Sequence, residues 1–327
     1  MRQFDLFRLP FFVLDSASIC LYIFTMEIIR ADVLGFCMGV CRAVDSVKKI
    51  LAENEKTGLQ PDIYTMGPLI HNPGVLKSLE EQGVKILEKE NIADLREKSV
   101  VVIRAHGVPP EIYNALEEKK AVIIDSTCPK VKGSQKKAEK YSKMGFKVIL
   151  AGDGGHGEVL GIAGFAGENF ILVQNRSEAE NLFADAGCFS GNQKIEKAVL
   201  LAQTTFSPVE FEAIKNILKS KIENLETFNS ICSATQERQD ALVKLCSETD
   251  GVIVVGGKNS ANTRRLYLKA NSLCRHAALV ENQLEVPPEF YKLEKVGIAA
   301  GASTPFDVIE AVEQQLRKGS AELNPVV

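Results

Sequence analysis

Short runs of apolar residues, rich in β-branched side chains, alternate with longer amphipathic stretches along most of this chain. Five runs are clearest, at residues 99–103, 121–125, 147–151, 198–202 and 251–255. Continuous apolar runs of this length are typical of strands that are buried on both faces of a parallel sheet. The alternation of such strands with helical stretches predicts an α/β fold with mainly parallel sheets.

Two of the stretches between these runs place their apolar residues on one helical face. The first contains Val40, Val44, Val47 and Leu51, and the second contains Phe211, Ile214, Ile217, Leu218 and Ile222. At about 150 residues per domain, the 327 residues allow two domains or three small ones. With 45 % hydrophobic and 25 % charged residues, the chain has a globular composition, which excludes a disordered or fibrous protein.

Three cysteines recur at intervals of about one hundred residues, the size of a small α/β domain, each after a strand-like run: Cys37, Cys128 and Cys232. This spacing indicates a threefold organisation in which strand ends converge on one point, where open α/β sheets bind ligands. Thiolates bind soft metals and iron–sulfur clusters, whereas a free cysteine is more commonly a small buried hydrophobic residue. The second interpretation is preferred for the other five: Cys20, Cys41, Cys188, Cys246 and Cys274.

The four histidines are informative because of their settings. His71, His106 and His156 lie in loops flanked by Gly or Pro, directly after predicted strands. Such loops are where functional residues concentrate. His276 lies in a stretch that we expect to be helical and is expected to be an ordinary surface residue.

The loop after residues 147–151 has two features. A G-x-G-x-x-G pattern begins at Gly152 and matches dinucleotide sites, but the next strand ends in Gln174 where a ribose-binding acid is expected. The same open loop contains His156 and Glu158, an imidazole and a carboxyl that together can pass a proton to a substrate. The loop therefore favours proton transfer over dinucleotide binding.

Segments rich in hydroxyl and amide side chains follow three strands, at residues 203–205, 258–263 and 301–305. Small polar side chains and free backbone N–H groups at helix N-termini bind phosphate oxygens well. N-capping alone explains any one such segment. Three such segments favour phosphate binding.

The chain carries a net charge of −3 and no basic block of five or six residues, so it has no electrostatic footprint for nucleic acid. Near the N-terminus, the apolar stretch 9–25 is interrupted by Pro10 and Asp15. It falls short of the roughly 18 uncharged residues of a membrane span. We therefore expect residues 1–25 to be an extension outside the fold and not an anchor, with the fold starting near Met26.

Eight motifs occur in order along the chain: GFCMGVCRAV, GPLIHNP, RAHGV, DSTCP, GHGEVLG, AQTT, GKNSANTRRL and GASTP. In these motifs the chain resembles the IspH/LytB family of 4-hydroxy-3-methylbut-2-enyl diphosphate reductases over about residues 26–316. The resemblance implies three similar small α/β domains with mainly parallel sheets, arranged as a cloverleaf around one central 4Fe–4S cluster. We place these domains at residues 26–126, 127–229 and 230–327, the last including the C-terminal tail.

The resemblance also implies roles for individual residues. Cys37, Cys128 and Cys232 correspond to the cluster ligands, and Glu158 to the glutamate that delivers a proton. His156 and Thr204 correspond to residues that assist the reaction and contact the substrate. The remaining implied substrate-binding residues are His71, His106, Ser260, Asn262 and Ser303, and Thr235 corresponds to a further residue of the pocket.

Three positions depart from the family pattern. Gly157 stands where the family usually has Pro, and Ala261 replaces the second of two serines, which removes one phosphate contact. Phe306 separates Pro305 from Asp307, where an acid often follows the proline directly. None of these departures removes an implied ligand or the acid.

The reaction that the resemblance implies is reductive dehydroxylation of an allylic alcohol diphosphate to isopentenyl and dimethylallyl diphosphates. This is the last step of the non-mevalonate isoprenoid pathway, and it uses two electrons and two protons. An iron without a cysteine ligand would bind the substrate hydroxyl as a Lewis acid. The implied electron donor is a ferredoxin or flavodoxin, and the implied location is the cytoplasm, with no nucleic-acid or membrane partner.

Two other functions compete with this one. A non-catalytic iron–sulfur redox sensor would use the three cysteines, but it needs neither the acid Glu158 nor the Ser- and Asn-rich segments. An NAD-dependent dehydrogenase would use the Gly152 loop, a hypothesis that depends on a single glycine pattern.

Overall fold

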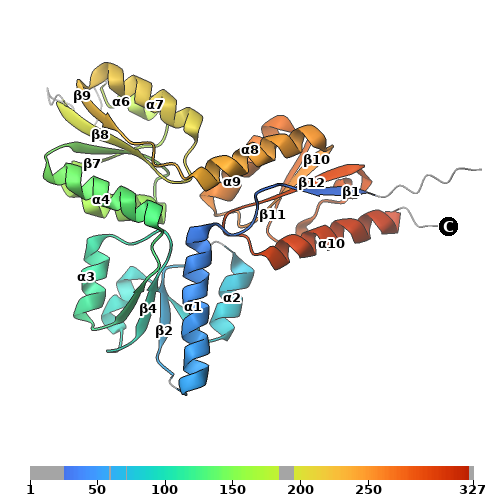
Figure 1. Cartoon of the computed structure of the whole chain (residues 1–327), viewed down its shortest axis with the longest axis horizontal. Coiled ribbons are helices and arrows are strands. Elements are labelled where there is room, and N and C mark those ends of the chain that lie inside the picture. The colour runs from blue at the N-terminus through green and yellow to red at the C-terminus, as the bar shows by residue number, and fades with distance from the viewer. Residues whose placement is uncertain (1–25, 59, 71, 184–194, 324–327) are drawn as a thin grey trace, which may run out of the picture.

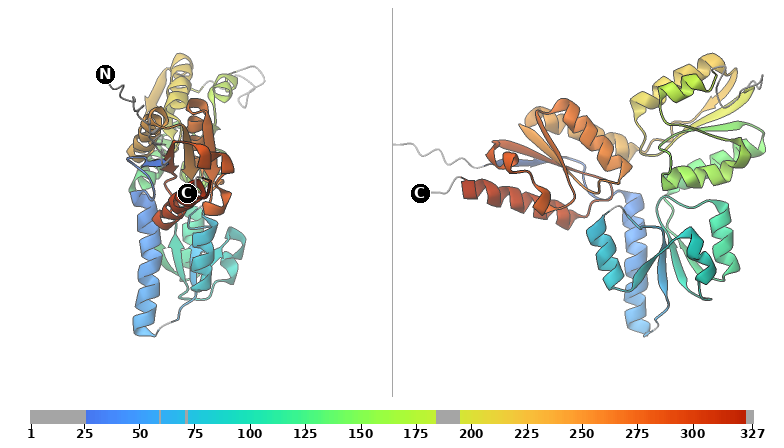
Figure 2. Two further views of the ribbon diagram at one scale, coloured as in Figure 1. Left: turned by 90° about the vertical axis from the view of Figure 1, so that its right-hand side faces the viewer. Right: turned by 180° about the vertical axis from the view of Figure 1, so that it is seen from behind.

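The computed structural model of this chain describes residues 26–58, 60–70, 72–183 and 195–323. The described residues form three lobes, each built on a four-stranded sheet (Figure 1). Every strand pair in the described part is parallel. The predicted α/β class, with three small parallel sheets, is confirmed. Seen edge-on, the lobes lie in roughly one layer (Figure 2).

The three units follow one plan, in which a helix precedes alternating strands and helices. The first unit contains α1 (Met38–Thr57), β2 (Ile63–Met66), α2 (Pro73–Glu81), β3 (Val84–Leu87), η1 (Lys89–Asp94), β4 (Val100–Ile103), α3 (Pro110–Glu118) and β5 (Val122–Asp125). The second contains α4 (Pro129–Lys143), β6 (Lys147–Ala151), α5 (Gly157–Ala166), η2 (Gly167–Asn169), β7 (Phe170–Val173), α6 (Arg176–Asn181), β8 (Lys197–Ala202), α7 (Pro208–Lys221) and β9 (Asn224–Thr227). The third contains α8 (Ser233–Glu248), β10 (Gly251–Val255), α9 (Ala261–Leu273), β11 (His276–Val280), η3 (Gln283–Glu285), η4 (Pro288–Lys292), β12 (Lys295–Ala300), α10 (Phe306–Leu323) and β1 (Glu27–Arg30).

The sheets also share one strand order. They read β3-β2-β4-β5, β7-β6-β8-β9 and β11-β10-β12-β1, so the first strand of each unit lies between its second and third. In the third unit the fourth place is taken by β1, which pairs with β12 in the register Glu27 to Lys295 through Arg30 to Ile298. The predicted domain 26–126 is therefore wrong at its first strand, because residues 27–30 complete the sheet of the third unit.

Helices cover both faces of each sheet. Alternate strand residues point to opposite sides and pack against the helices on either face. In the second unit, Ile149 and Leu200 pack with the apolar face of α7, whereas Val148 and Leu150 pack with α4 and α5. The predicted apolar face of α7 is buried as expected, with Ile217 only partly covered. This double coverage explains why the central strands are continuous apolar runs.

Within the described part of the chain, the structure has no helix that combines the length and the apolar composition needed to cross a bilayer.

Candidate active site

The three cysteines at strand ends occupy equivalent positions in the three units. Cys37, Cys128 and Cys232 are the N-cap residues of α1, α4 and α8, and none of their side chains caps its own helix by a hydrogen bond. Each backbone N–H donates to the carbonyl two residues beyond a neighbouring strand, at 3.0 Å to Ala302, 3.0 Å to Ala105 and 2.8 Å to Thr204 respectively. The repeated contact holds three helix starts at the carboxyl ends of three sheets.

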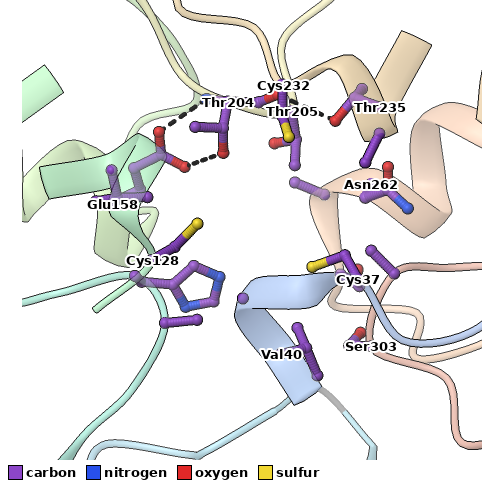
Figure 3. A pocket seen from close by; sticks show the side chains of 18 of the residues that line it. Cys37, Val40, Cys128, Glu158, Thr204, Thr205, Cys232, Thr235, Asn262 and Ser303 are labelled. Atoms are coloured by element: carbon purple, nitrogen blue, oxygen red, sulfur yellow. Dashed lines mark hydrogen bonds between the residues drawn. The ribbon is translucent and has the colours of Figure 1, made fainter. Parts of the chain in front are cut away.

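These three thiols face one cavity where the lobes meet (Figure 3). The cavity has about 820 Å³ of empty space, part of it open to solvent, which is room for a small ligand. Burial raises the pKa of the Cys128 thiol, and the nearby charges of Cys37 and Cys232 raise it further. The backbone N–H groups of Lys130 and Val131 oppose this shift, so the first turn of α4 is directed at the sulfur.

Glu158 lies in the wall of the same cavity, in the first turn of α5, and is 1 % exposed. The sequence places Glu158 in an open loop, and the structure corrects this, because α5 begins at Gly157 and buries the carboxyl. Its Oε1 accepts the backbone N–H of Thr204 and its Oε2 accepts the Thr204 hydroxyl, both at 2.7 Å. Burial outweighs these hydrogen bonds and raises the pKa of Glu158 to about 7.

An ion pair between the second and third units lies close to Glu158. Arg265 on α9 donates to Asp153 at 2.6 Å, and its guanidinium lies over the Phe206 ring at 5.4 Å from the centroid. The charge of Asp153 raises the pKa of Glu158, whereas that of Arg265 lowers it. The pair therefore joins two lobes and acts on the acid of the cavity with opposing fields.

Two of the three loop histidines lie at the cavity. His156 is the N-cap of α5, and its Nδ1 accepts the backbone N–H of Glu158 at 3.2 Å. The ring of His106 packs edge-on against that of His156, with 4.8 Å between centroids. His71 lies outside the described residues. The helix expected at His276 is wrong, since His276 begins strand β11, where it is half-buried and packs near Phe290.

Buried polar side chains line the cavity from the third unit. Ser260 is the N-cap of α9, and its hydroxyl accepts the N–H of Thr263 at 3.4 Å. Asn262 follows in the first turn of α9, and Ser303 follows β12. Among the described residues, Asn262 Nδ2 and Ser303 Oγ are buried without a hydrogen-bond partner. Leaving such groups unsatisfied is costly, and they face a cavity in which an oxyanion would satisfy them.

The other cysteines have different surroundings. Cys41 lies one turn after Cys37, and burial raises the pKa of its thiol. Cys246 and Cys274 pack against the apolar core between α8 and the sheet of the third unit, as predicted for both. Cys20 and Cys188 lie outside the described residues.

Several residues that line the cavity were not singled out as site residues in the sequence. Arg238 is a buried arginine from the second turn of α8, and Gly39 lets α1 approach Cys128, since a Cβ there would lie 3.1 Å from its Sγ. Thr205 lines the cavity beside Thr204. A mid-helix arginine and a helical glycine have no signature in a single sequence. Thr205 could have been found, because it lies in the polar segment 203–205.

The predicted Thr235 also lines the cavity (Figure 3). Its hydroxyl donates to the carbonyl of Thr204 at 3.0 Å, the same oxygen that accepts the N–H of Cys232. Thr204 thus connects the carboxyl of Glu158 with the loop that carries Cys232.

Comparison with known proteins gives a consistent result. Residues 28–317 match the sequence profile of the family described as LytB protein. The 4-hydroxy-3-methylbut-2-enyl diphosphate reductase of Treponema denticola is 47 % identical over 298 residues, which cover 90 % of this chain and 100 % of that protein. The protein of the same name from Caldanaerobacter subterraneus subsp. tengcongensis is 39 % identical over 298 residues, covering 91 % and 99 %.

Solved structures agree. A structure of (E)-4-hydroxy-3-methyl-but-2-enyl diphosphate reductase, described as the terminal enzyme of the non-mevalonate pathway, has a TM-score of 0.64 and 35 % identity, covering 90 % of this chain and 99 % of that one. The E-1-hydroxy-2-methyl-but-2-enyl-4-diphosphate reductase of Plasmodium falciparum has a TM-score of 0.77 and 30 % identity, covering 92 % and 89 %. On its profile match, its relatives and its three-lobed fold, this chain belongs to the LytB family.

Proposed function

We propose that this protein reduces 4-hydroxy-3-methylbut-2-enyl diphosphate to isopentenyl and dimethylallyl diphosphates, with one 4Fe–4S cluster held by Cys37, Cys128 and Cys232. The observation that carries the proposal is the buried carboxyl of Glu158 in the same cavity as three thiols. A thiol triad alone fits many metal sites, but an acid with a pKa of about 7 beside it fits a reaction that consumes protons.

The donor set fits an iron–sulfur cluster. Thiolates are the usual ligands of such clusters, and three of them leave one iron position free. The three N-terminal helix ends, with their partial positive charge, favour an anionic group between them. When bound, the cluster would supply single electrons and a Lewis-acidic iron at the substrate hydroxyl.

Glu158 is the proposed general acid. A carboxyl with a pKa of about 7 is protonated in a large fraction of molecules at neutral pH, so it can protonate the departing hydroxyl as water. The Thr204 hydroxyl, at 2.7 Å from Glu158 Oε2, holds the carboxyl in place. His156 fixes the start of α5 through its Nδ1, and its proposed role is to relay a proton toward the acid.

The diphosphate is proposed to bind at the polar side of the cavity. Asn262 Nδ2 and Ser303 Oγ supply donors that lack partners among the described residues. The remaining proposed contacts come from Ser260, His106 and the predicted His71. Neutral donors at a helix N-terminus suit phosphate oxygens and would orient the substrate hydroxyl toward the thiols. The electrons are proposed to come from a ferredoxin or flavodoxin.

Ligand assignment is tested by iron content. Changing Cys37, Cys128 or Cys232 to Ser should remove the brown iron–sulfur absorbance from anaerobically purified protein, because a neutral hydroxyl is a poor substitute for thiolate. Cys41, Cys246 and Cys274 provide matched controls, and their serine variants should keep the iron of the wild type. Equal iron in both sets would contradict the assignment.

The acid is tested by Glu158→Gln, which keeps the size of the side chain and cannot release a proton. With confirmed cluster content and a chemical reductant, single-turnover product formation should fall by about 10²–10⁴-fold while substrate affinity stays near normal. Undiminished turnover would remove Glu158 from the mechanism.

The two competing functions predict different results. A redox sensor would hold iron but leave the allylic diphosphate unchanged. A dehydrogenase would bind NADH without iron. The structure gives a reason against the second, because Gln174 already accepts the N–H of Gly154 at 2.8 Å and so occupies the Gly152 loop.

A further inference from the structure

Arg238 lines the cavity and is almost fully buried, with 4 % of its surface exposed. It comes from α8, the helix that begins after Cys232. Its two Nη groups donate to backbone carbonyls, at 2.7 Å to Gly35 and 2.9 Å to Ala234. Its Nε is buried and has no hydrogen-bond partner among the described residues.

These contacts connect the two loops that carry thiols. Gly35 lies two residues before Cys37, with a φ of 77° that favours glycine, and Ala234 lies two residues after Cys232. Arg238 therefore bridges the segment from β1 to α1 and the first turn of α8. A side chain in this position is held at a fixed place relative to both sulfurs.

The contacts leave the positive charge of Arg238 without a full counter-charge. Backbone carbonyls are neutral, and burying a cation without an anionic partner is costly. Burial lowers the pKa of the guanidinium, and the charges of Cys37 and Cys232 oppose this shift more strongly than that of Glu237 does. Among the neighbouring groups, Cys37 and Cys232 therefore do most to offset the buried charge of Arg238.

We propose that Arg238 is a positioning residue that supplies the buried counter-charge for the anionic group held by Cys37 and Cys232, and that it thereby raises the reduction potential of that group. This inference rests on the proposed function, because the group is the cluster. Adding an electron makes a cluster more negative, so a fixed nearby cation stabilises the reduced state over the oxidised one. Net charge and hydrogen bonding around the sulfurs are known determinants of such potentials.

The test is a redox titration of the holoenzyme, followed by visible absorbance and by the electron paramagnetic resonance signal of the reduced cluster. Arg238→Met removes the charge and keeps the volume of the stem. The ratio of reduced to oxidised cluster at a fixed potential should fall at least tenfold, a shift of about 59 mV to more negative potential for one electron. Arg238→Lys keeps the charge but loses the planar set of guanidinium donors. Its ratio of reduced to oxidised cluster should stay within about threefold of the wild-type value.

Arg104 provides a matched control. Its guanidinium also has a buried Nε without a partner among the described residues, but the charge that acts on it is that of Glu88. Arg104→Met should leave the potential of the cluster unchanged. An unchanged potential in Arg238→Met, or equal shifts in Arg238→Met, Arg238→Lys and Arg104→Met, would overturn the inference.

Loss of iron from the Arg238 variants would also separate a role of the charge from a purely structural role. If Arg238→Met and the neutral Arg238→Gln both fail to hold iron while Arg238→Lys holds it, the charge itself is required and the inference stands. If Arg238→Lys fails as well, the role of Arg238 is to tie the two loops together, and the inference is wrong. A wild-type protein that binds no cluster would instead contradict the proposed function, which iron analysis reveals before any titration.

Discussion

At equivalent positions of the three repeated units, different side chains line the cavity. The carbonyls that hold the three cysteines belong to Ala105, Thr204 and Ala302, and the residues that follow them are His106, Thr205 and Ser303. The N-caps of α2, α5 and α9 are likewise Asn72, His156 and Ser260. Each unit thus presents its thiol in the same way, whereas the proposed acid comes from the second unit and the proposed phosphate donors come mainly from the third.

The buried acid has a cost in stability that a neutral side chain avoids. The pKa of Glu158 is about 7 in the folded protein against an ordinary 4.5, so the folded state binds this proton more tightly. Wild-type stability should therefore fall as the pH rises from about 4.5 to about 7. Glu158→Gln should remove this loss and be more stable by on the order of 3 kcal/mol at pH 8. Chemical denaturation at pH 5 and pH 8 measures the difference in the free energy of unfolding between Glu158→Gln and wild type. The same difference at both pH values would contradict the prediction.

The ion pair next to Glu158 should tune the pH dependence of the reaction. If Glu158 acts as the acid, the rate falls as the pH rises through its pKa. Arg265→Met removes a charge that lowers this pKa, so the alkaline limb should move to higher pH; Asp153→Asn removes one that raises it, so the limb should move to lower pH. Single-turnover rates against pH for both variants check the opposite signs. Shifts in the same direction would rule out this coupling.

Sequence reasoning found residues whose place follows from strand ends, and missed those whose place follows from packing between lobes. Cys37 and Glu158 lie in the segments that follow strand-like runs, so their convergence could be expected from the rule for parallel sheets. Arg238 lies in a helix of mixed polarity, and its burial depends on the contact with Gly35 from a distant part of the chain. No local pattern encodes that contact.

At the scale of elements, the cavity depends on how closely the first turns of α1 and α4 approach each other. Gly39 in α1 faces Cys128 at the N-cap of α4, with 3.1 Å between its ideal Cβ and both Cβ and Sγ of the cysteine. That spacing is tighter than ordinary van der Waals contact. A side chain at residue 39 would push either the helix or the thiol outward.

Gly39→Ala should therefore reduce the iron bound per folded protein by at least about twofold, since Cys128 must move to make room. Gly133→Ala is the matched control, because Gly133 lies inside α4 with nothing within 4 Å of its ideal Cβ. That variant should keep full iron and gain up to about 1 kcal/mol of stability. Iron analysis and thermal melting of both proteins test this prediction. Full iron in Gly39→Ala would show that α1 and Cys128 tolerate a side chain between them.

Strands made of continuous apolar runs were predictable from sequence, including the edge strand β5, whereas a polar edge strand was not. β6, β8 and β10 are continuous apolar runs because helices cover both faces. β9, with the sequence NLET, lies at the edge of its sheet and is only half covered. The partner of β1 could not be derived at all, because its four residues contain no information on which of three sheets they join.

At the scale of the whole molecule, strand β1, near the start of the described chain, completes the sheet of the third lobe. Four residues of β1 pair with β12, and Arg30 at the end of β1 forms an ion pair with Glu313 of α10 at 2.6 Å. The two elements that carry these contacts lie at opposite ends of the described chain.

Removing residues 1–30 should destabilise the protein, because it deletes β1 and exposes the edge of β12. We expect the melting temperature to fall by about 5 °C or more and the bound iron to fall with it. Removing residues 1–25 is the control and should leave both unchanged, as the sequence predicts for an extension. If the shorter deletion were equally harmful, residues 1–25 would be part of the fold.

The pairing of β1 with β12 also sets the order in which the protein can be assembled during synthesis. Almost the whole chain lies between the two strands, so at about 5–20 residues per second β1 waits on the order of tens of seconds for its partner. Cys37 comes shortly after β1 in the chain, and its N–H donates to the carbonyl of Ala302, beyond β12. The first of the three proposed ligands to leave the ribosome is therefore the last to be fixed, and a nascent chain has no complete site until its final lobe has formed.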